Sequence, residues 1–201
     1  MLPKALLNVI DALGALPGVG SRTAERYAYF LFKSDPQISE NISSALAGLH
    51  AGIKYCPVTF ALISADEDFS PLYTDPERDK TTVLVVEEPL DIYAIEQAKA
   101  FSGTYHVLGG AISPIDGITP DQLHIKELVK RTEDDDVKEI IIATNPSVEG
   151  ESTALYLEKI LHSAKPSLKL TRLARGLPLG VDISYADQIT ISAALENRTN
   201  L

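Results

Sequence analysis

The chain of 201 residues predicts an α+β protein of several domains, with helical ends and an α/β part between them. Apolar residues recur at helical spacing through residues 1–54. From residue 80 onward, short β-branched runs alternate with helical patterns, which is typical of a mostly parallel sheet whose strands are joined by helices. A segment with three prolines, residues 55–79, separates these two patterns and predicts a linker or a small hairpin module.

The composition suits a folded protein and excludes a protein coated with basic residues. Apolar residues make up 45% of the chain, and the net charge is −10. Residues 1–55 carry five basic and four acidic side chains, so any nucleic-acid contact is expected in this part or in local patches. The lone Cys56 excludes an intramolecular disulfide and suits a reducing cytoplasm. We expect neither a signal peptide nor a membrane span, because no apolar run approaches the roughly 18 residues that a span needs.

The N-terminal pattern predicts two helices joined by a tight turn. The first helix starts near Pro3 and ends at Gly14, and the second runs from Arg22 to Phe32. The turn Leu16–Gly20 resembles the helix-hairpin-helix motif of DNA-repair proteins. Two glycines let the backbone approach a phosphate, and the helix that follows offers free N–H donors. The residues expected to contact DNA are Gly18, Val19, Gly20, Arg22 and Arg26.

The alternative is a plain helical hairpin in which the glycines only form the turn. A third helix, Ile38–Leu49, is expected to pack on the first two helices through Ile42, Leu46 and Leu49.

Carboxylates follow two of the expected strands. Glu87 and Glu88 come directly after Thr82–Val86, and Glu149 and Glu151 open the helix after Ile140–Ala143. Ligands of parallel sheets bind beyond such strand ends, so the carboxylates can converge on one site. The alternative is that they only cap helices.

This arrangement resembles the Toprim domain of topoisomerases and primases. In that domain two aspartates stand where this chain has Asn145 and Ser147.

The remaining elements follow the same alternation of strands and helices. The expected helices and strands are Leu90–Phe101, Tyr105–Leu108, Leu123–Arg131, Ser152–Ser163, Leu168–Leu173 and Tyr185–Leu195. A long loop, Gly109–Asp121, follows the second strand.

Together these segments resemble the RecR family of bacterial recombination mediators. The matching stretches are Leu16–Gly20, Thr82–Asp91, Tyr105–Asp121, Ala143–Leu155 and Thr171–Asp187. The resemblance implies a homo-oligomeric ring or clamp on single- and double-stranded DNA, without enzymatic activity. It also implies the partners RecO and sometimes RecF, with which such proteins load the RecA recombinase. The implied domains are 1–54 (helix-hairpin-helix), 55–79 (zinc-finger-like), 80–174 (Toprim) and 175–201 (C-terminal segment).

One departure from the family concerns metal binding. The resemblance implies a four-cysteine zinc finger, but its four ligand positions hold Cys56, Thr59, Ser70 and Tyr73. A structural zinc site needs four thiolate or imidazole ligands, so we predict that zinc is absent. An apolar core is expected to replace it, with a loose loop as the alternative. The candidate core residues are Phe60, Leu62, Ile63, Phe69, Leu72 and Tyr73.

Two other functions compete with a DNA-binding scaffold. One is a magnesium-dependent Toprim-type nuclease using Glu87, Glu149 and Glu151, and the other is a purely structural oligomerisation module. Asn145 and Ser147 remove two charges from such a metal site, which favours binding over catalysis. We therefore expect no cofactor beyond, at most, weakly held Mg²⁺ at the acidic cluster of Glu87, Glu88, Glu149 and Glu151, which is otherwise expected to contact a partner.

Overall fold

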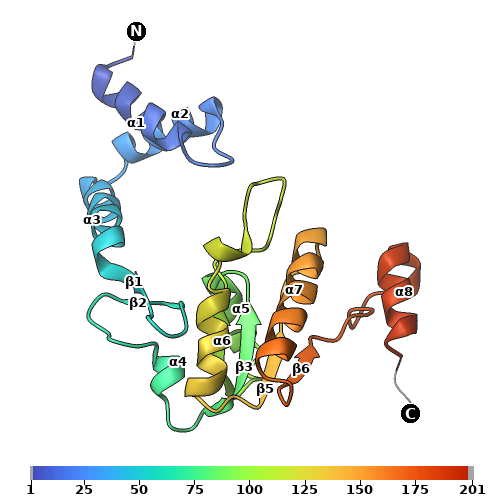
Figure 1. Ribbon diagram of the computed structural model, residues 1–201. Helices are drawn as coiled ribbons and strands as arrows, with labels where there is room; N and C mark the ends of the chain where they lie inside the picture. Colours follow the sequence, from blue (N-terminus) through green and yellow to red (C-terminus); the bar gives the residue numbers. More distant parts are fainter. Residues whose placement is uncertain (1, 199–201) are drawn as a thin grey trace. The chain divides into compact units, whose positions relative to one another are not determined.

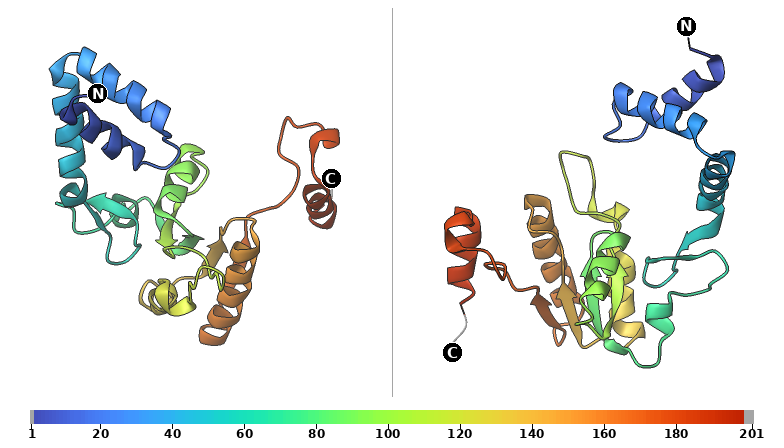
Figure 2. Two further views of the ribbon diagram at one scale, coloured as in Figure 1. Left: turned by 90° about the horizontal axis from the view of Figure 1, so that it is seen from above. Right: turned by 180° about the vertical axis from the view of Figure 1, so that it is seen from behind.

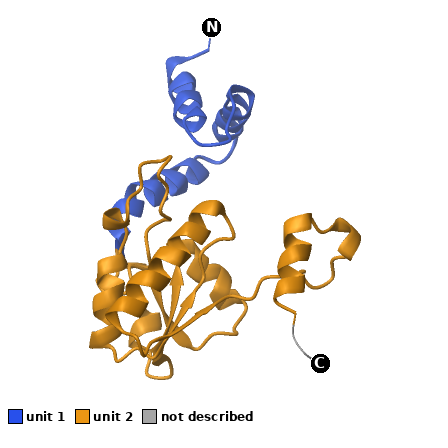
Figure 3. Ribbon diagram, turned by 45° about the vertical axis from the view of Figure 1, so that its right-hand side comes forward, with its two compact units in different colours: residues 1–54 blue, residues 55–201 orange. Residues whose placement is uncertain are grey.

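The computed structural model describes residues 2–198. It divides into two compact units, residues 1–54 and residues 55–201 (Figure 3). Residues 199–201, the end of the expected C-terminal segment, lie outside the described residues.

The first unit consists of α1 (Lys4–Gly14), α2 (Ser21–Lys33) and α3 (Pro36–Gly52), as shown in Figure 1. Two small residues of α2, Ala24 and Ala28, are buried, which lets α1 and α2 pack closely. The N–H of Gln37 donates to the Asp35 side chain at 3.0 Å, and Pro36 occupies the first turn of α3. Both are favourable ways to begin a helix.

The expected core face of α3 is not buried within this unit. Ile42, Leu46 and Leu49 are 45%, 64% and 48% exposed, so the prediction that they pack on the first two helices was wrong. Helical periodicity identifies an apolar face but does not say which surface covers it.

The second unit is organised around a parallel sheet of four strands. These are β3 (Asp79–Val86), β4 (Gly103–Val107), β5 (Glu139–Ile142) and β6 (Lys169–Arg172), in the order β4-β3-β5-β6. The sheet therefore confirms the expected α/β architecture. It places β3 and β5, whose ends carry the glutamates, side by side.

Helices cover both faces of this sheet (Figure 2). α6 (Ile125–Asp134) and α7 (Val148–Ala164) pack on the face that carries Val83 and Val85. α5 (Pro89–Gln97) packs on the opposite face, against Leu84 and Val86. This alternation along β3 is the period of two that a strand buried on both faces requires.

Shorter elements complete the second unit. They are β1 (Ile53–Tyr55), which begins at the end of the first unit, β2 (Leu62–Ser64), α4 (Pro71–Thr74), two 3₁₀ turns at Pro120–Gln122 and Ile183–Tyr185, and α8 (Gln188–Glu196). The N–H of Thr190 donates to the side chain of Asp187 at 2.9 Å, which caps α8. Among residues 2–198, no helix has the length and apolar character needed to cross a bilayer.

Candidate functional site

The turn between α1 and α2 is exposed, and its backbone is accessible to a ligand. Gly18 has φ +77°, a left-handed conformation that glycine adopts without steric cost. The N–H of Val19 donates to the carbonyl of Leu16 at 3.1 Å and closes the turn. Gly20 precedes the first turn of α2, and no side chain caps that turn. The N–H groups of Thr23 and Ala24 donate to the Gly20 carbonyl, so within residues 2–198 those of Ser21 and Arg22 remain free to donate to an anion such as a phosphate.

Two arginines follow this turn on the same helix. Arg22 and Arg26 are exposed and lie four residues apart, so they point to the same side of α2. Within residues 2–198, neither forms an ion pair with a carboxylate. The Arg26 guanidinium lies 5.6 Å from the centre of the Tyr27 ring, which supports its side chain from one side. All five residues expected to bind DNA thus lie in or directly after one exposed turn.

At the end of β3, the carboxylate of Glu87 accepts hydrogen bonds from Asn145, which follows the neighbouring strand β5. Asn145 donates to it twice, from the backbone N–H at 2.8 Å and from Nδ2 at 2.6 Å. Glu87 is buried, and Gly150 lies so close that an added Cβ would stand 2.8 Å from Glu87 Oε1 and 2.1 Å from the Asn145 carbonyl oxygen. The carboxylate therefore fastens the turn after β5 to the end of β3.

Glu151 is occupied by two arginines. Arg172 Nη2 donates to its Oε1 at 2.5 Å, and Arg175 Nη2 contacts the same oxygen. Hydrogen bonds from Arg175 and Arg172 lower the pKa of Glu151 to about 2. The carboxylate is thus ionised and neutralised by the chain itself.

The other two glutamates serve their own helices. Glu88 precedes α5 and forms a capping box with Asp91, in which the Glu88 N–H donates to the Asp91 carboxylate at 2.8 Å. Glu149 lies in the first turn of α7, where a carboxylate opposes the positive end of the helix dipole. Among residues 2–198, no three His, Cys, Asp or Glu side chains are placed to hold a metal ion together. Glu88 and Glu149 therefore act as helix-capping residues, which is the alternative to a ligand site stated above.

Sequence reasoning missed the partners that hold these carboxylates. The sequence shows Asn145 only as a residue in place of an aspartate, and it predicts no role for Arg172 and Arg175. The signal was available for the arginines, because Arg172 lies at the end of a strand that was expected in the same sheet and Arg175 follows it. Parallel strands end at the same edge, so basic and acidic residues at their ends can meet.

Three family descriptions match successive parts of the chain and leave residues 50–80 between the first two unmatched. "RecR, helix-hairpin-helix" matches residues 6–49, "Toprim domain" matches 81–174, and "RecR, C-terminal" matches 176–199. The chain is 45% identical to the recombination protein RecR of Acidothermus cellulolyticus, which covers 100% of this chain and 99% of that protein. It is 46% identical to the proteins of the same name from Thermobifida fusca (100% and 99% covered) and Moorella thermoacetica (99% and 98% covered). The chain belongs to the RecR family.

Three of the four positions that the family resemblance assigns to zinc ligands lie around one centre. Cys56, Thr59 and Ser70 are buried around one centre, where Cys56 Sγ accepts from the N–H groups of Thr59 at 3.5 Å and Ser70 at 3.4 Å. Tyr73 turns away from this centre and donates its hydroxyl to Asp135 Oδ1 at 2.9 Å.

The apolar core expected to replace the metal in this RecR chain exists in part. Ile63 is buried, and Phe60 and Leu72 pack against the sheet face that carries Leu84 and Val86. Leu62 and Phe69 are 44% and 43% exposed, so their inclusion in a buried core was wrong. The core forms against the Toprim sheet, and not between the two turns, because the small segment has too few apolar residues to bury one another.

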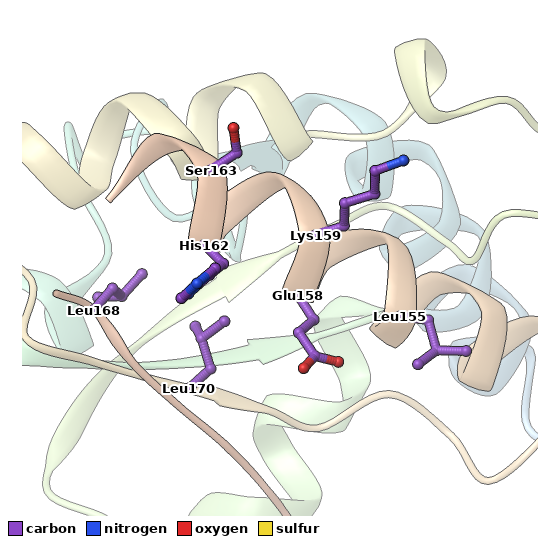
Figure 4. Close-up of a pocket in the computed structure, with 7 residues that line it drawn as sticks. All are labelled: Leu155, Glu158, Lys159, His162, Ser163, Leu168 and Leu170. Atoms are coloured by element: carbon purple, nitrogen blue, oxygen red, sulfur yellow. The ribbon is translucent and has the colours of Figure 1, made fainter. Parts of the chain in front are cut away.

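A cavity of about 560 Å³ lies between α7 and β6 of the RecR Toprim domain (Figure 4). It is lined by Leu155, Glu158, Lys159, His162, Ser163, Leu168 and Leu170. None of the predicted site residues lines this cavity. It borders the edge strand of the sheet, away from the glutamates that follow β3.

Proposed function

We propose that the chain is a DNA-binding scaffold of recombinational repair that has no enzymatic activity. It binds single- and double-stranded DNA through the turn after α1 and acts with RecO, and with RecF where that protein exists, to load RecA on gapped DNA in the cytoplasm. The relatives at about 45% identity are named recombination proteins. The observation that carries the proposal is the uncapped start of α2 followed by two exposed arginines, Arg22 and Arg26, that pair with no carboxylate in the part of the chain that the structure describes.

A homo-oligomer is the second part of the proposal. The first unit carries an apolar groove of about 890 Å³ between α1, α2 and α3, and Phe32 and Leu46 on its border are exposed. Tyr185, which precedes α8, and Ile189, within α8, are exposed as well. Large exposed apolar surfaces of this kind mark contacts between chains. Several DNA-binding turns in one assembly would compensate for the weak charge of each one.

The carboxyl ends of the strands are proposed as the surface for RecO. Exposed apolar side chains, Leu90 and Tyr93 on α5 and Val148 on α7, accompany Glu88 and Glu149 there. An acidic rim around apolar contacts suits a partner with a basic surface.

The nuclease alternative is disfavoured by the state of its carboxylates. Metal-assisted cleavage needs several oxygen ligands free to surround one ion. Glu87 accepts two hydrogen bonds from Asn145, and Glu151 is paired with two arginines. Incubation of the protein with supercoiled and linear DNA and with Mg²⁺ or Mn²⁺ should give no cleavage. Cleavage that is abolished by Glu87→Gln would establish the nuclease instead.

A RecA-loading assay tests the scaffold function. RecA assembly on gapped DNA is followed by fluorescence, with this chain and RecO from the same organism added singly or together. We expect faster assembly only when both are present, and expect Arg22→Ala with Arg26→Ala to abolish the gain. If RecO gives the same rate with and without this chain, the loading function is wrong.

A further inference from the structure

The zinc finger implied by the family does not fit the donors of this chain. One thiol, Cys56, faces two hydroxyl residues, Thr59 and Ser70, and the fourth position, Tyr73, directs its hydroxyl to Asp135. A closed zinc site takes four thiolate or imidazole ligands. The backbone nevertheless keeps two turns around the sulfur, since the N–H groups of Thr59 and Ser70 both point at Cys56 Sγ. Burial raises the pKa of Cys56, but hydrogen bonds from the Thr59 side chain and from the backbone of Thr59, Val58 and Ser70 together outweigh burial and lower it overall.

We infer that the finger segment, residues 55–79, is held in place by the Toprim domain instead of by a metal ion. Each of its two turns is attached to that domain by side-chain or backbone contacts. Its fold is therefore coupled to the Toprim domain, whereas a zinc finger derives its fold from the metal that it binds.

The second turn is attached through Tyr73. Its hydroxyl donates to Asp135 Oδ1 at 2.9 Å, and Arg131 Nε donates to the other oxygen of Asp135 at 2.8 Å. Arg131 is buried and also donates to the carbonyl of Tyr105 at 2.6 Å and to Thr104 Oγ1 at 2.7 Å. The guanidinium of Arg131 lies 5.2 Å from the Tyr73 ring centre. A charge-assisted network thus runs from the finger segment to β4.

The first turn is attached through Thr59 and Phe60. The carbonyl of Thr59 accepts from the N–H of Val107, the last residue of the edge strand β4, at 2.8 Å. The Phe60 ring stacks on the His124 ring, with centres 3.7 Å apart and planes 7° apart. Phe60 has φ +57°, which costs free energy in a residue with a Cβ, so this position is sustained by its contacts.

Hydrogen exchange of the intact chain tests the attachment at Tyr73. Tyr73→Phe keeps the ring and removes the hydroxyl, and we expect amide exchange in residues 56–73 to rise about tenfold. Tyr93→Phe removes a hydroxyl from an exposed tyrosine of α5 and should leave exchange unchanged. Unchanged exchange in Tyr73→Phe would show that the segment does not depend on this contact.

A second pair of variants tests the attachment at Phe60. Phe60→Ala removes the ring stacked on His124, and Phe69→Ala removes a ring that is exposed within the same segment. We expect limited proteolysis to cleave residues 55–79 faster in the first variant only. Equal cleavage rates in the two variants would overturn the assignment of Phe60 as an anchor.

Metal analysis tests the replacement itself. Protein purified without chelators should contain no stoichiometric zinc, and about one zinc ion per chain would refute the inference. The variant Thr59→Cys, Ser70→Cys, Tyr73→Cys supplies four thiols on the retained turns, so it should take up about one zinc or cobalt ion per chain, with the thiolate-to-cobalt absorption of a tetrahedral site. A folded triple variant that takes up no metal would show that the two turns do not keep the geometry of a finger.

Discussion

Asn145 donates both its backbone N–H and its side-chain amide to the carboxylate of Glu87, at 2.8 and 2.6 Å. The pair joins the ends of β3 and β5, where a metal-dependent Toprim enzyme would need a free carboxylate. Asn145 occupies one of the positions where the resemblance implies aspartate, and an amide can donate to Glu87 where a carboxylate would repel it. With asparagine in place of aspartate at position 145, the Glu87 carboxylate accepts hydrogen bonds from the chain where a Toprim enzyme would use it as a metal ligand.

Substitution of Glu87 should therefore reduce stability. Glu87→Ala leaves two donors of Asn145 without their acceptor and should lower the free energy of unfolding by about 2 kcal/mol. Asn145→Ala removes only the side-chain bond and should cost about 1 kcal/mol. Urea unfolding followed by circular dichroism measures both. A larger loss in Asn145→Ala than in Glu87→Ala would contradict this hydrogen-bond arrangement.

The pKa of Glu151 should depend on its arginines. Arg175 and Arg172 hold it at about 2, below the ordinary value near 4.5. Because the pKa is lower in the folded state, the ion pairs stabilise the fold above about pH 4.5, and this stabilisation is lost as the pH falls from 4.5 to 2. Carboxyl NMR titration should show a higher pKa for Glu151 in Arg175→Ala. A pKa that stays at about 2 in this variant would mean that Arg175 does not contact Glu151 in solution.

The two glycines of the hairpin should separate folding from DNA binding. Gly18→Ala places a Cβ on a residue with φ +77° and should cost about 1–2 kcal/mol of stability. Gly20 has φ −78°, and no atom lies within 4 Å of an added Cβ, so Gly20→Ala should fold normally. It should still weaken DNA binding, because the Cβ stands where a phosphate would approach. Thermal unfolding and fluorescence anisotropy measure the two effects, and wild-type DNA affinity in Gly20→Ala would exclude a close backbone approach.

The sequence predicted β3, β4 and β5 well because these strands are largely buried on both faces, whereas the edge strand β6 is only partly buried. Ile140 and Ile142 face one side of β5 and Ile141 faces the other, which produces a continuous apolar run that is easily identified. The contacts between distant residues could not be predicted in the same way. Tyr73 and Asp135 are 62 residues apart, and nothing local to either residue indicates the other.

The sequence pattern also could not predict which helix surfaces are buried. The apolar face of α3 is plain from Ile42 and Leu46, but its exposure depends on what covers it. The glutamates show the same limit. Their residue type marks Glu87 and Glu151 as potential metal ligands, but whether their carboxylates are free depends on the hydrogen bonds from Asn145 and Arg172. Pattern thus gave the position of the candidate site, and packing decided its chemistry.

DNA binding of the intact chain as a function of salt tests the central claim most directly. Affinity for a labelled gapped duplex is measured by anisotropy for the wild type, for Arg22→Ala with Arg26→Ala, and for Lys4→Ala with Lys159→Ala, which removes the same charge from exposed positions elsewhere. We predict that the arginine variant binds at least about tenfold more weakly and that its plot of log affinity against log salt is shallower by about 2 for each hairpin engaged. The lysine variant should bind nearly as the wild type does. Equal affinity and slope in all three proteins would contradict the account.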